Sequence, residues 1–90
     1  QTCALPIYYI LVISTDQNMN FEEIEKVINP FVINMNIRSQ EIQNGNSEMV
    51  LELDLKSHKP KEMEEFTKQL YAIERIKSVS LLSPQLSLPA

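Results

Sequence analysis

The sequence predicts an α+β fold of the ferredoxin-like type, in which a four-stranded antiparallel sheet carries two helices on one face. Four segments show the patterns of strands, and two segments show the 3.6-residue repeat of helices. The segments follow the order β-α-β-β-α-β with short connections. An Asn44-Gly45 pair separates the second strand from the third, as in hairpins. The first and third strands are expected to be central.

The first strand is expected over residues 8–15, YYILVIST, an apolar run that is rich in β-branched and aromatic side chains. A run without a polar stripe is typical of a central strand that is covered on both faces. One alternating set of side chains should pack against the helices: Tyr9, Leu11 and Ile13. The other set should point to the opposite face of the sheet: Tyr8, Ile10 and Val12.

The first helix is expected to begin after Asn20, which can cap it, with Glu23 three residues on as in a capping box. Apolar residues then follow at helical spacing: Phe21, Ile24, Val27, Ile28 and Phe31. Pro30 disfavours the helical conformation at Asn29, so the helix should end near Asn29. One further, distorted turn is the alternative.

Residues 33–39 and 49–56 alternate strictly and are expected to form a hairpin. A two-residue Asn-Gly turn would pair Gln43 with Asn46 and place each apolar set opposite a polar one. We therefore predict a three-residue loop, Gln43 to Gly45, with Gly45 left-handed in a bulge. That register pairs Ile33 with Leu55, Met35 with Leu53 and Ile37 with Leu51. It also places Asn36 opposite Glu52, and Arg38 diagonal to Glu48 or Glu52.

Pro60 suits the first turn of the second helix. Its apolar stripe is expected to be Met63, Phe66, Leu70 and Ile73. Residues 77–83 should form the last strand, which Pro84 ends. The domain is thus predicted over residues 8–84, and residues 85–90 are expected to be a loose tail.

Residues 1–7, QTCALPI, translate back into the end of a common sequencing adapter, and Tyr8 has a codon that begins with the adapter's last base. We interpret the segment as an artefact joined to a truncated gene, and exclude it from the fold. A secretory signal is the alternative, but the segment has no initiator Met, no basic region and no cleavage site. The natural protein is accordingly expected to extend upstream of Tyr8.

Composition argues against several classes of function. The chain has 8 basic and 12 acidic residues and a net charge of −4, which disfavours nucleic acid and anionic membrane surfaces as partners. The single cysteine, Cys3, lies in the excluded segment, so we expect no disulfide and no thiolate metal site. The apolar run at residues 8–13 is far shorter than the ~20 residues of a membrane span. No cofactor is expected.

No residue pattern indicates an active site, and the fold by itself does not decide function. The loop at residues 16–20 has no Arg, Lys or Gly with which to hold a phosphate, as an acylphosphatase-like enzyme would need. His58 is the only histidine and is expected to be a solvated loop residue. Glu48, Glu52 and Asp54 could bind a divalent cation, but the wet face of a half-exposed strand explains them more simply. We therefore predict a chain that is not an enzyme.

One apolar surface is unexplained by the fold. Four side chains should lie on the sheet face that the helices leave open: Tyr8, Ile10, Val12 and Leu82. We predict that they form an interface, covered by another sheet, a second copy of the chain or a domain upstream. Ordinary apolar surface beneath long neighbouring side chains is the alternative.

Residues 8–15, the capped helix at Asn20, the hairpin and IERIKSVSLLS at residues 73–83 together resemble the ACT-domain superfamily. Ile73, Ile76 and Val79 match the approach to the last strand in that superfamily, with Arg75-Ile76 where Gly-Val is common. The resemblance implies a regulatory domain. Amino-acid-binding members have a glycine in the loop after the first strand, which residues 16–20 lack, so the resemblance assigns no ligand residue.

A narrower resemblance is to the ACT-like cytosolic tails of MgtC-like and related uncharacterised bacterial membrane proteins, carried by EIEKVINPF, LELDL and VSLLS. It implies a non-catalytic regulatory or dimerisation domain at the C-terminus of a larger bacterial protein, in the cytoplasm and tethered to the inner membrane by upstream helices. The alternative is an ACT-like domain that binds an amino-acid effector within a metabolic enzyme or regulator.

Overall fold

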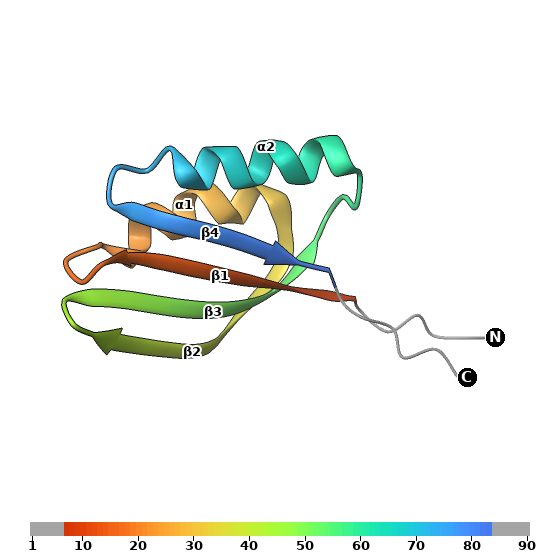
Figure 1. Cartoon of the computed structure of the whole chain (residues 1–90). Helices are drawn as coiled ribbons and strands as arrows, with labels where there is room; N and C mark the ends of the chain where they lie inside the picture. The colour runs from red at the N-terminus through yellow and green to blue at the C-terminus, as the bar shows by residue number, and fades with distance from the viewer. Residues whose placement is uncertain (1–6, 84–90) are drawn as a thin grey trace, which may run out of the picture.

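The computed structural model describes residues 7–83, which form one antiparallel sheet with both helices on the same side (Figure 1). The strand order is β2-β3-β1-β4, so the first and third strands are central as predicted. The elements are β1 (Tyr8–Asp16), α1 (Phe21–Ile28), the 3₁₀ turn η1 (Asn29–Phe31), β2 (Val32–Gln43), β3 (Asn46–Leu55), α2 (Pro60–Tyr71) and β4 (Ile76–Leu82). The predicted fold class is confirmed, whereas the predictions for residues 1–6 and 84–90 lie outside the described residues.

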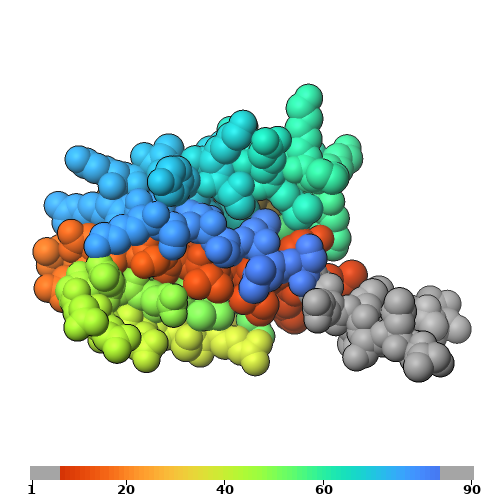
Figure 2. All heavy atoms as spheres, in the orientation of Figure 1, coloured from red at the N-terminus to blue at the C-terminus, as the bar shows by residue number. Residues whose placement is uncertain are grey.

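The core lies between the sheet and the two helices. Its fully buried apolar side chains come from both layers: Leu11, Ile13, Ile24, Ile28, Leu51, Leu53, Phe66 and Leu70. Each contributes about 1.5–3 kcal/mol through the removal of its apolar surface from water. Side chains of α2 meet those of β4 along one edge of this layer (Figure 2). The alternation predicted for the first strand is confirmed, because Tyr9, Leu11 and Ile13 are buried in the core.

Local signals define both ends of α1 and the start of α2 as predicted. Asn20 caps α1, and its side-chain oxygen accepts a hydrogen bond of 3.0 Å from the Glu22 amide. The helix ends at Ile28, and η1 supplies the further distorted turn around Pro30. Pro60 occupies the first turn of α2, where its missing N–H costs nothing.

The predicted three-residue hairpin loop is wrong. Gln43 pairs with Asn46, and the two residues between them have positive φ, 53° at Asn44 and 78° at Gly45. This is the two-residue turn with two left-handed residues that Asn-Gly favours. The register shift that we placed in the turn is instead a β-bulge at Arg38, since Ile37 pairs with Leu51 and Ser39 pairs with Val50.

The bulge preserves most of the predicted apolar pairs. Met35 faces Leu53 and Ile37 faces Leu51, as the alternation requires. The pair of Ile33 with Leu55 is wrong, because a second irregularity puts Val32 opposite Leu55 and leaves Ile33 68% exposed. A 2.9 Å hydrogen bond from the Lys56 amide to the Phe31 carbonyl continues this register, in which β2 begins at Val32, one residue before the predicted start.

Candidate functional site

The four residues predicted as an interface lie on the sheet face opposite the helices. Tyr8, Ile10 and Val12 alternate with the core residues of β1 and are half-buried. Leu82 pairs with Ile10 and is 53% exposed. Val50 pairs with Val12 and completes the group. We call these five side chains the open-face strip. Among residues 7–83, no helix lies over it (Figure 1).

Val50 was missed from the sequence, although a signal for it existed. It stands next to Leu51, which the predicted pairing with Ile37 includes in the apolar set of the hairpin, so strand alternation already placed Val50 on the opposite face. Only the pairing of β3 with β1 brings it beside Val12. The group that the sequence identified as one strand plus Leu82 is therefore a strip that crosses three strands.

The polar side chains around the open-face strip are divided between its two sides. The side toward β2 and β3 is acidic. Glu41 of β2 lies opposite Glu48 of β3, and Glu52 and Asp54 lie further along β3. The sides toward β4 and the end of β1 carry serines: Ser14, Ser78 and Ser80. Arg38 forms an ion pair of 2.9 Å with Glu52, one of the two diagonal partners predicted for it.

The acidic residues of β3 do not form a metal centre in the described part of the chain. Glu52 is engaged by Arg38, and no three His, Cys, Asp or Glu side chains of residues 7–83 converge on one point. His58 is exposed in its loop, but its ring also stands edge-on to the ring of Tyr9, with the centroids 5.3 Å apart. Neither helix of this part is both long and apolar enough to cross a bilayer.

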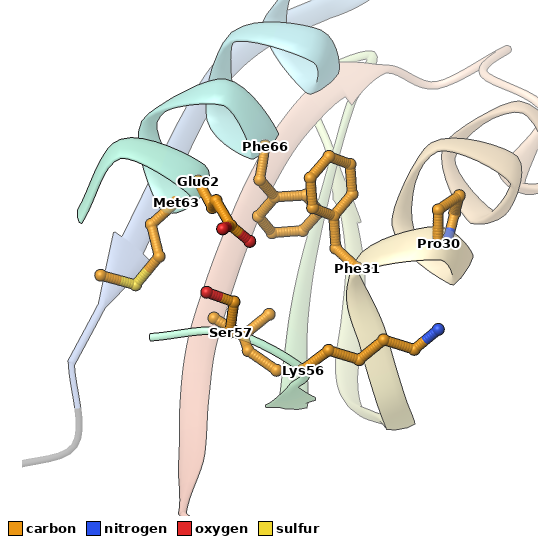
Figure 3. A pocket seen from close by; sticks show the side chains of 8 residues that line it. Pro30, Phe31, Lys56, Ser57, Glu62, Met63 and Phe66 are labelled. Carbon is orange, nitrogen blue, oxygen red and sulfur yellow. The ribbon is translucent and has the colours of Figure 1, made fainter. Parts of the chain in front are cut away.

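A cavity of about 150 Å³ lies at the end of the sheet where η1, the end of β3 and the start of α2 meet. We call it the helix-end cavity. Phe31 and Phe66 form its wall, with ring centroids 4.9 Å apart and planes at 46° (Figure 3). Its remaining lining is Pro30, Leu55, Lys56, Ser57, Glu62 and Met63. Sequence patterns did not reveal it, because its residues come from three separate segments of the chain.

The polar groups of the helix-end cavity are asymmetrically placed. The Glu62 carboxylate and the Ser57 hydroxyl point toward one another, beside Met63 (Figure 3). Lys56 extends the other way, so that its carbon stem lines the cavity while its ammonium lies toward Pro30 (Figure 3). The Ser57 oxygen accepts a 3.2 Å hydrogen bond from the Lys59 amide. The cavity thus combines an apolar interior with one carboxylate and one hydroxyl at its mouth.

Comparisons with known proteins agree with this architecture. No protein-family model matches the chain, and no curated protein matches it. The crystal structure of the ACT domain from the GTP pyrophosphokinase of Chlorobium tepidum is similar, with a TM-score of 0.59 and 19% identity over 83% of this chain and 96% of that domain. The solution NMR structure of that domain gives a TM-score of 0.57 and 21% identity, covering 88% of each chain. The chain therefore shares the ferredoxin-like fold of an ACT domain.

Proposed function

We propose that this chain is a non-catalytic regulatory domain that acts by self-association through the open-face strip. The strip carries the proposal: five apolar side chains lie together on a sheet face that has no helix over it among residues 7–83. A contiguous apolar surface is typical of an interaction site, because its contact with water is unfavourable. The fold likeness to an ACT domain supports a regulatory role.

A second copy of the chain suits this face because of the distribution of charge. The acidic side chains lie toward β2 and β3, and the serines lie mostly toward β4. A two-fold axis parallel to β1 would place the acidic half of one copy over the serine-bearing half of the other. Such a symmetric contact would bury both strips without opposing their carboxylates, and two-fold dimers are the commonest assemblies.

The oligomeric state of the 90-residue chain tests the proposal by sedimentation over a range of concentrations. We expect a dimer that becomes a monomer in Ile10→Glu, because a buried, unpaired carboxylate is strongly disfavoured. Ile42→Glu is the matched control, since Ile42 is 63% exposed and projects from the other face of the sheet. A chain that stays monomeric at high concentration, or a dimer that survives Ile10→Glu, would exclude the open-face strip as the contact.

The resemblance of EIEKVINPF, LELDL and VSLLS to the tails of MgtC-like membrane proteins supports a further part of the proposal. The domain would be the cytoplasmic C-terminal part of a larger bacterial membrane protein. A long read through the gene tests this point by establishing which sequence precedes Tyr8. Several apolar stretches of ~20 residues are expected before Tyr8. A start codon directly before Tyr8, or a soluble enzyme upstream, would overturn the membrane assignment.

A further inference from the structure

We propose that the helix-end cavity binds a small organic cation, in which one ammonium group is attached to a compact apolar body. This inference goes beyond the self-association proposed above and depends on different residues. It follows from the size of the cavity, from the character of its wall and from the orientation of the polar groups at its mouth.

The interior of the cavity fits a body of about one aromatic ring. Its volume is about 150 Å³. An engineered cavity of about that volume, lined by apolar side chains in an unrelated protein, binds benzene. Phe31 and Phe66 present ring surfaces, and Met63 adds a polarisable side chain that adapts to irregular shapes. The Lys56 stem completes the apolar lining while its charge stays outside.

The mouth of the cavity selects the sign of the charge. Between residues 7 and 83 the ion pairs are Arg38–Glu52 and Lys68–Glu64, so the Glu62 carboxylate is left without a cationic partner there. It points toward Ser57, whose oxygen keeps a second lone pair beyond the one used by the Lys59 amide. An ammonium group at this point would donate to both oxygens and lie near the two aromatic rings, which also attract cations.

The surroundings of the mouth contain an opposing influence. Lys59 and Lys61 flank the start of α2, and the N-terminal end of a helix favours anions. Glu62 already occupies the first turn of this helix and places a negative charge there. An anionic ligand would have to approach that carboxylate, whereas a cation would be paired by it. The net charge of −4 also favours the approach of a cation.

Three probes of one shape test the inference: benzylamine, benzyl alcohol and benzoate. Each is titrated into the 90-residue chain while amide chemical shifts are followed by NMR. We expect benzylamine to bind with a Kd of about 1 mM, with shifts concentrated at residues 55–57 and 60–66. Benzyl alcohol should bind about fivefold to tenfold more weakly, because it lacks the charge that Glu62 pairs. Benzoate should bind most weakly of the three.

Glu62→Gln should reduce the affinity for benzylamine to that for benzyl alcohol and leave the alcohol unaffected. Glu65→Gln is the matched control, because Glu65 is exposed on the same helix outside the cavity and should change neither affinity. If benzoate bound as tightly as benzylamine, the inference would be overturned in favour of an anion site. Absence of binding at 20-fold the expected Kd, shifts located elsewhere, or an unchanged affinity in Glu62→Gln would overturn it as well.

Discussion

The two faces of the sheet differ although the same strands form both. On the face that packs against the helices, Leu11, Leu51 and Leu53 are entirely buried. On the other face Ile10, Val12 and Val50, their immediate neighbours in sequence, are only half-buried. Neighbouring residues of similar chemistry thus differ in their surroundings: the helix-covered face stabilises the fold, and the open face keeps apolar surface in contact with water, where we propose association. Substitutions should separate these two roles.

The largest effect is expected from a pair of substitutions at adjacent positions of β3. Leu51→Ala should reduce the free energy of unfolding by about 2–5 kcal/mol, because it removes packed methyl groups and leaves a cavity. Val50→Ala, on the open face, should cost about 1 kcal/mol or less in the monomer. Urea unfolding measures both at a concentration where the chain is monomeric. Equal losses of unfolding free energy would mean that Val50 is packed as tightly in the monomer as a core residue.

The hairpin turn sets the register of β2 from Ser39 to Gln43, and the bulge at Arg38 then shifts the register for the earlier residues of β2. Gly45 has a φ of 78°, and a Cβ at this position would meet no atom within 4 Å. Gly45→Ala should therefore destabilise through the backbone alone, by about 1–2 kcal/mol. Asn44→Gly is the control, since glycine accepts the φ of 53° there without strain. A neutral Gly45→Ala would indicate that the turn rearranges.

The covered face depends on α1, and α1 depends in part on its cap. Asn20→Ala removes the acceptor for the Glu22 amide and should reduce stability by about 1 kcal/mol. Thermal unfolding followed by circular dichroism measures the loss. Asn18→Ala, in the same loop, should have little effect, because only its backbone groups are engaged. A similar loss in both variants would point to the loop rather than to the cap.

The smallest effect is expected on the open face, at the Arg38–Glu52 ion pair. The Arg38 side chain is 60% exposed, so Arg38→Gln should cost about 0.2–1 kcal/mol, and less at high salt. The double variant with Glu52→Gln should lose little more than either single variant, since both remove the same interaction. Strictly additive losses in urea would show that the two side chains act independently.

The hairpin shows how far sequence reasoning extends. Alternation correctly required Met35 to face Leu53 and Ile37 to face Leu51. It also showed that a plain two-residue turn is incompatible with those pairs. It could not locate the residue that resolves the conflict, because a bulge anywhere in β2 produces the same shift. The Asn-Gly pair kept its preferred turn, and the extra residue was accommodated at Arg38.

The two candidate sites could be predicted from the sequence to different degrees. Tyr8, Ile10 and Val12 could be assigned to one face because they belong to a single alternating strand. The helix-end cavity could not be found in this way. Phe31, Ser57 and Glu62 follow different periodicities in three segments, and their approach depends on how η1 and α2 meet the end of β3.

The sequence by itself determined the type and order of the elements, the Asn20 cap of α1 and the core-facing side of β1 and β3. These properties depend on residue periodicity and on hydrogen bonds between near neighbours. Tertiary structure alone decided the position of the bulge at Arg38, the addition of Val50 to the open-face strip and the formation of the helix-end cavity. Each of these depends on contacts between residues far apart in the chain, whose geometry is set by packing and leaves no periodic signal in the sequence.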